Sequence, residues 1–368
     1  MKKNIAIAAI IFSAMFINSC STETANNANV QPFESQEVKY PLLEGYPLAV
    51  IESLEAKEQQ LELLTSGMDK SRAGAIISAS RTWKPGKTIM VAFSGGDPDL
   101  RQQIAEGIRP WSDAANLNFD FGYSSQANTY REWSSADTGY KADIRIAFLK
   151  GQDGGYWSAV GRDSINKTMF RPGDPSMNFE GFDEILPEDW QAILIHEFGH
   201  AIGFEHEHQS PNSSCETEYR WDDDPGYIPT KDQHQQFVRD NQGRRPGIYT
   251  ILGGAPNYWS QRKVDFNLRK FANSTDWFLT SFDRLSIMKY HFSSWMYQDL
   301  SVSTSSGCYS DPSSGLSTED RRAALAVYPR TPSDIRAVTD ERADISREVI
   351  SRKDVSKDLK DQYKINLK

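Results

Sequence analysis

An eleven-residue run from His196 to His206 constrains this sequence more than any other feature. It reads H-E-F-G-H-A-I-G-F-E-H. His196 and His200 lie four positions apart, so on an α-helix their imidazoles project from one face, one turn apart. Gly203 can adopt a positive φ, end the helix and turn the chain so that His206 returns toward the same point. Three imidazole ligands leave a fourth position open, which is typical of catalytic rather than structural zinc and predicts one zinc ion per chain.

Glu197 directly follows the first of these histidines, where it reaches the water at the open zinc position without itself binding the metal. Zinc lowers the pKa of such a water toward about 7, and Glu197 is expected to take its proton and later protonate the leaving amine. The sequence has no serine nucleophile of the G-x-S-x-G type. It therefore predicts hydrolysis of peptide bonds by direct attack of water. The competing interpretation is a helix whose histidines only cap or pair.

Further along the chain, residues 286–290 read S-I-M-K-Y. Together with H-E-F-G-H-A-I-G-F-E-H-E, this segment resembles the astacin branch of the metzincin zinc metalloproteases, in a bacterial form. In that family the methionine forms a tight turn beneath the zinc, and the tyrosine can bind zinc and then swing away to stabilise the oxyanion. The resemblance assigns these roles to Met288 and Tyr290. A matrixin-like protease is the nearest competitor, and Glu207 and Tyr290 argue against it.

The sequence departs from the family pattern at three places. Lys289 stands where the family usually has histidine, so the local electrostatics differ while the zinc ligands do not. The arginine- and aspartate-rich continuation after the helix is replaced by H-Q-S-P-N at 208–212. The F-x-G-D motif, whose aspartate holds many astacins latent, is absent upstream of Trp83. The sequence therefore leaves latency open.

The resemblance extends over roughly residues 81–329 and implies an α+β zincin/metzincin fold. Such a fold has a twisted mixed β-sheet with a backing helix, and an active-site helix above an irregular C-terminal subdomain. Residues 102–115 have the helical spacing of the backing helix, and residues 143–148 alternate as a half-buried strand near the substrate-binding edge. Pro187 suits the first position of the active-site helix. Further expected elements are strands at 88–93 and 176–179, a helix at 48–66, and a helix that starts at Ser317 or Thr318.

Residues 1–19 have the pattern of a signal peptide. Lys2 and Lys3 precede an apolar run over residues 5–17, which is too short to span a membrane. Cys20 follows directly and resembles the lipidation site of a bacterial lipoprotein, with ordinary signal-peptidase cleavage as the alternative. A lipid on Cys20 would anchor the chain to a membrane of the bacterial cell envelope, facing the periplasm or the outside. Without lipidation the protein would be secreted.

The remaining cysteines and the composition complete the expected organisation. Cys215 and Cys308 form a pair in an exported chain and are a candidate disulfide, with two free buried thiols as the alternative. Residues 20–80 are expected to form a lipidated tether followed by a pro-segment or an accessory helix. The catalytic domain would span residues 81–330, and residues 331–368 form a charged tail, either a solvated helix or a disordered end.

Two functions from different classes fit this sequence. The first is an exported zinc endopeptidase acting on protein or peptide substrates; the alternative is an envelope lipoprotein that uses the zincin scaffold mainly for binding. Glu197 and all ligand positions are filled, which favours the enzyme. The formal net charge of −9 and the absence of a basic stretch argue against nucleic acid as a partner. Substrate preference is not fixed by the sequence, although Arg220 or Arg262 in the cleft wall would favour acidic side chains.

Overall fold

The computed structural model describes residues 42–269, 281–299 and 306–368, which belong to one compact unit. The expected signal peptide, Cys20 and the N-terminal part of the tether lie outside the described residues. Among the described residues, no helix is long and apolar enough to cross a membrane.

A mixed β-sheet with strand order β2-β1-β3-β5-β4 lies at the centre of the catalytic segment. Strands β2, β1, β3 and β5 run parallel to one another, and β4 pairs with β5 in the antiparallel direction. The predicted α+β class and mixed sheet are confirmed. The strands are β1 (Thr88–Phe93), β2 (Asn118–Asp120), β3 (Ile144–Ala147), β4 (Tyr156–Ser158) and β5 (Met177–Phe179).

Two helices, α3 (Pro98–Gly107) and α4 (Arg109–Ala114), pack against the active-site helix α5 (Trp190–Ala201). The prediction of one continuous backing helix over 102–115 is therefore wrong. Pro110 lies in the first turn of α4, where its missing N–H interrupts the helical hydrogen-bond ladder. The apolar face predicted for this segment is nevertheless buried.

Strand β3 lies inside the sheet, between β1 and β5, and all four of its residues are buried. The prediction of a half-buried strand near the substrate-binding edge is therefore wrong for this segment. Arg145 made the strand look half polar, but its guanidinium is buried and donates to the carbonyls of Asp174 and Ser164. The edge strand on this side of the sheet is β4, and its residues are also buried.

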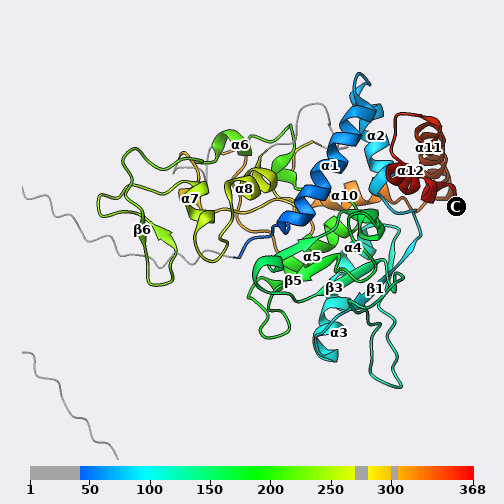
Figure 1. The fold of residues 1–368 in the computed structure, drawn as a ribbon, viewed down its shortest axis with the longest axis horizontal. Coiled ribbons are helices and arrows are strands. Elements are labelled where there is room, and N and C mark those ends of the chain that lie inside the picture. Colours follow the sequence, from blue (N-terminus) through cyan, green and yellow to red (C-terminus); the bar gives the residue numbers. More distant parts are fainter. Residues whose placement is uncertain (1–41, 270–280, 300–305) are drawn as a thin grey trace, which may run out of the picture. The chain divides into compact units, whose positions relative to one another are not determined.

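Helices from both ends of the described chain share a second apolar core. These are α1 (Leu48–Thr65), α2 (Lys70–Arg81), α11 (Pro332–Ser351) and α12 (Lys357–Lys364), and Figure 1 shows α11 and α12 beside α2. The prediction of a solvated or disordered tail is wrong, because one face of each tail helix is buried. The boundary predicted at residue 81 stays a prediction, and α1 and α2 pack together with the tail.

The chain between α5 and the tail is largely irregular, as predicted. Helix α10 (Thr318–Val327) begins with a capping box made by Ser317 and Asp320. The other elements are α6 (Cys215–Glu218), β6 (Thr230–Lys231), β7 (Phe237–Val238), α7 (Ile248–Gly253) and α8 (Gln261–Leu268). Short 3₁₀ helices span Gly151–Asp153, Gly161–Ile165, Glu207–Gln209, Ser294–Met296 and Ile365–Leu367.

Candidate metal centre

The active-site helix is held from both sides by apolar packing and indole hydrogen bonds. It begins at Trp190, three residues after the predicted start, because Pro187 lies in a preceding turn and its carbonyl accepts from the Trp190 N–H. The Trp111 indole donates to the carbonyl of Ile195. A Cβ at Gly199 would collide with the Met288 sulfur, so glycine is required for this close approach.

A turn after α5 returns the chain to the helix, as the sequence predicts. Gly203 has φ +102°, a conformation that favours glycine. Its N–H donates to the carbonyl of His200, and the Phe204 N–H donates to that of Gly199. The turn brings His206 beside the two helical histidines, with 3.2 Å between the Nε2 atoms of His200 and His206.

Each histidine of the motif has its Nδ1 bound to a carbonyl oxygen. His196 Nδ1 donates to the Ile287 carbonyl at 2.6 Å, and His200 Nδ1 donates to the Phe204 carbonyl at 2.7 Å. His206 Nδ1 donates to Gln209 Oε1 at 2.9 Å. Because a carbonyl oxygen only accepts, each imidazole carries its proton on Nδ1 and presents the Nε2 lone pair to the centre. This is the arrangement that second-shell partners give to metal-binding histidines.

A carboxylate far away in the sequence, Glu44, completes the centre. Its oxygens lie 2.5 Å from His196 Nε2, 2.9 Å from His200 Nε2 and 2.8 Å from His206 Nε2. Glu44 and the histidines are buried, and their ligand atoms all lie within 4.8 Å of one another. With Nδ1 protonated, all four groups offer lone pairs, so they repel one another unless a cation lies between them. The residues present therefore fit a divalent metal such as zinc.

Glu197 is buried beside this centre, and its Oε2 has no hydrogen-bond partner among the described residues. Burial raises the pKa of the Glu197 carboxyl well above its ordinary value, and the nearby Glu44 carboxylate raises it further. A buried carboxyl with a free oxygen and a raised pKa is suited to exchanging protons with a molecule in the site.

The S-I-M-K-Y segment forms a turn directly against helix α5. The Asp320 carboxylate accepts from the Ser286 hydroxyl at 2.6 Å and from the Ile287 N–H at 3.0 Å, which fixes the turn to α10. The Met288 carbonyl accepts from the Glu207 N–H, next to the third histidine. The structure therefore places Met288 in contact with the helix, as the resemblance implies.

Tyr290 lies at the same centre. Its hydroxyl donates to the Glu44 carbonyl at 2.6 Å, and its ring centroid is 4.7 Å from that of His206. Its N–H donates to His208 Nδ1, and the two rings lie 4.5 Å apart. Lys289 is buried and its side chain donates to the Tyr290 carbonyl, and burial lowers its pKa to about 7.

The segment that carries Glu44 lies along the edge strand. Its Gly45 N–H donates to the Tyr156 carbonyl of β4, in a parallel bridge. On one side the Leu43 N–H donates to Asn257, and on the other the Tyr46 hydroxyl donates to the Ser158 carbonyl. The segment therefore occupies the edge at which a peptide could add as a strand.

The sequence predicts the histidines, Glu197, Met288 and Tyr290 as one site, and the structure brings them together. It does not predict Glu44 or Gln209, because neither belongs to a motif. The structure also joins Cys215 and Cys308 in the expected disulfide, with 4.9 Å between their Cα atoms. Cys20 lies outside the described residues.

No protein-family model matches this sequence. Over 189 residues the chain is 26% identical to zinc metalloproteinase dpy-31 of Caenorhabditis elegans, a match that covers 51% of this chain and 26% of the relative. Over 178 residues it is 27% identical to the macrophage metalloelastase of Oryctolagus cuniculus, covering 45% of this chain and 32% of the relative. The chain thus spans a quarter to a third of the length of these curated relatives. Its predicted resemblance to zinc metalloproteases is confirmed, and the bacterial form stays a prediction.

Two solved structures are also similar to this chain. Myroilysin is 28% identical with a TM-score of 0.48, and the match covers 68% of this chain and 97% of myroilysin. High choriolytic enzyme 1, a hatching-enzyme zinc protease from Oryzias latipes, is 16% identical with a TM-score of 0.36, covering 69% of this chain and 97% of that enzyme.

Proposed function

We propose that this protein is a zinc-dependent endopeptidase in which His196, His200 and His206 hold one zinc ion. The observation that carries the proposal is the convergence of three Nε2 lone pairs whose Nδ1 atoms are all bound to carbonyl oxygens. The sequence relatives, which are metalloproteinases, support the same metal and the same reaction class.

The residues around the metal have separate tasks in peptide hydrolysis. Bound zinc would act as a Lewis acid and lower the pKa of a water in the site. Glu197 takes the proton of the attacking water and delivers it to the leaving amine. The Tyr290 hydroxyl, which donates to a carbonyl in the present structure, is placed to donate to the oxyanion that develops on the scissile carbonyl. Met288 packs against α5 at Gly199, the residue before His200.

We further propose that the structure corresponds to a latent state. Glu44 faces all three histidines, and its neighbours cover the edge strand. A substrate would have to displace this segment to reach the metal. Helices α1 and α2 would stay in place, because they share a core with α11 and α12. Arg81 strengthens this attachment through a buried ion pair with Asp163 and a partly buried one with Glu205. The removable part would therefore end before Leu48.

Location is a separate proposal, based on the N-terminal sequence. A signal peptide over residues 1–19 and a lipid on Cys20 would anchor the enzyme at a bacterial envelope. Mass spectrometry of the protein purified from detergent-solubilised membranes tests this. An N-terminal peptide that begins with diacylglyceryl-cysteine supports lipidation, and an unmodified N-terminus in the medium would overturn it.

The proposed activity is tested with purified protein and a mixture of unstructured peptides. Zinc content is measured in the same samples, for the parent chain and for Glu44→Ala, Glu197→Gln and the double variant. We expect about one zinc per chain in each protein, strongest cleavage with Glu44→Ala, and none whenever Glu197 is replaced. Cleavage that survives the Glu197 substitution would contradict the mechanism.

A further inference from the structure

A cavity of about 270 Å³ is lined in part by Leu43, the residue directly before Glu44. Leu43 stands at its wall, together with residues of α7 and of the chain that follows Tyr290. The main apolar lining residues are Leu43, Ile251, Leu252, Phe292, Met296 and Tyr309. The cavity adjoins the metal centre, because Phe292 also contacts Tyr290, with 6.1 Å between the ring centroids.

The walls of this cavity are held in place by the surrounding structure. Ile251, Leu252, Phe292 and Met296 are each at most 5% exposed. The Phe292 ring packs edge-on against Tyr219, with 5.2 Å between the centroids. Side chains that are fixed in this way form a pocket before any ligand arrives, which is the usual condition of a binding site for small apolar groups.

The lining of the cavity carries no Asp, Glu, Lys or Arg among the described residues. Its polar members are Asn257, His291, Ser293 and Ser310. The two arginines that would favour acidic substrates are bound elsewhere. Arg220 donates to the carbonyls of Pro246 and Trp295. The acidic preference considered from the sequence therefore has no support at these positions.

Arg262 forms ion pairs outside the cavity. Its guanidinium pairs with Glu52 and Glu55 of α1, and its side chain is about half exposed. It therefore joins α8 to α1 at the surface and is not a wall of the cavity.

We infer that this cavity takes an aliphatic or aromatic side chain of the peptide substrate, next to the scissile bond. The inference rests on the proposed function. Leu43 lines the cavity and directly precedes Glu44, which faces the metal ligands. When a substrate replaces this segment, the residue next to its scissile bond would contact the same cavity walls. An apolar cavity of about 150 Å³ already holds benzene, so the larger cavity accommodates an aromatic ring. A carboxylate entering it would lose its hydration without gaining a cationic partner.

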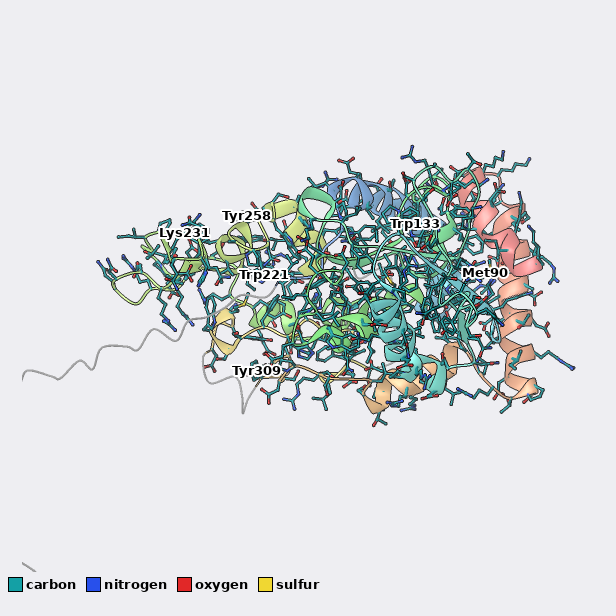
Figure 2. The ribbon with its side chains drawn as sticks, turned by 90° about the horizontal axis from the view of Figure 1, so that it is seen from below. Met90, Trp133, Trp221, Lys231, Tyr258 and Tyr309 are labelled. Atoms are coloured by element: carbon teal, nitrogen blue, oxygen red, sulfur yellow. A yellow bond between two sulfur atoms is a disulfide. The ribbon has the colours of Figure 1, made fainter. Side chains whose placement is uncertain are left out.

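The test compares peptides that differ at one position and uses Glu44→Ala protein as the active form. We expect peptides with Leu or Phe beside the cleaved bond to be cleaved about 10- to 100-fold faster than those with Asp. Tyr309→Arg adds a cation to the wall and should reduce this ratio at least several-fold. The matched control is Tyr258→Arg, which makes the same change at an exposed tyrosine; Figure 2 shows Tyr258 and Tyr309 well apart. Equal cleavage of all peptides, or a preference for Asp, would overturn the inference.

A binding experiment keeps the inference separate from the proposed function. The same peptides carry a fluorophore, and their anisotropy is measured with the Glu44→Ala/Glu197→Gln protein. The pocket is supported if the Leu and Phe peptides bind more tightly than the Asp peptide and if Tyr309→Arg, but not Tyr258→Arg, weakens their binding. This result supports the pocket even if no variant cleaves the peptides. Absence of cleavage would then count against the proposed activity alone, whereas binding without an apolar preference would count against the pocket.

Discussion

Replacement of Glu44 by alanine is expected to activate the unprocessed protein. The Glu44 carboxylate faces all three histidines, and its oxygens lie within 2.9 Å of their Nε2 atoms. A hydrogen bond to a charged group contributes about 1.5–3 kcal/mol, and we assign this magnitude to the contact of the Glu44 carboxylate with the metal centre. Each 1.4 kcal/mol is about a factor of ten in an equilibrium constant. Loss of the carboxylate should therefore raise the population of the open form, and with it kcat/KM, by about 10- to 100-fold.

The assay is the initial rate of cleavage of a quenched fluorescent peptide, with zinc content measured on the same samples. The control is Glu62→Ala, which removes an exposed carboxylate of α1 from the same part of the chain. It should leave the rate unchanged. An unchanged or lower rate for Glu44→Ala at full zinc occupancy would refute the argument, because the segment would then not limit access to the metal.

Further predictions concern the parts that hold the site. A chain that begins at Leu48 should stay folded and active. A chain that begins at Thr82 should lose its cooperative thermal transition, because removal of α1 and α2 exposes the core that they share with α11 and α12. Equal melting temperatures of the two truncated chains would contradict this. Arg81→Met should lower the free energy of unfolding by about 1–3 kcal/mol, because the carboxylates of Glu58 and Glu205 lose the guanidinium that donates to them, while Asp163 keeps its ion pair with Lys57; urea denaturation measures the change, and an unchanged free energy of unfolding would show that these ion pairs do little. Replacing Cys215 and Cys308 by serine should lower the free energy of unfolding by about 2–5 kcal/mol, measured in the same way; a variant as stable as the parent would refute a stabilising role.

The sequence predicts which histidines converge because the responsible signals are local. The spacing of His196 and His200 is fixed by the helical repeat, and the return of His206 is fixed by one glycine. These relations hold in any fold that contains the helix. Glu44 could not be found in this way, because its position depends on the packing of a distant segment against the edge strand.

The errors in the fold prediction have a similar origin. The strand over 143–148 is predicted to be half-buried because polar and apolar residues alternate along it, and the resemblance implies a place near the substrate-binding edge. Arg145, one of its polar residues, is nevertheless buried, and its guanidinium donates to backbone carbonyls inside the protein. The tail was assigned to solvent because it is rich in charges. Ile345, Val349 and Tyr363 nevertheless form one buried face against α2. Which partner covers an amphipathic helix is a tertiary property that its own sequence does not specify.

The central claim is that three histidines hold zinc for a reaction in which Glu197 transfers the proton. Comparison of two variants tests this claim most directly. Zinc content and peptide cleavage are measured in parallel for Glu44→Ala and Glu44→Ala/Glu197→Gln. The account predicts about one zinc per chain in both proteins and cleavage only in the first. Equal cleavage by both proteins, or cleavage by protein that contains no zinc, would contradict it.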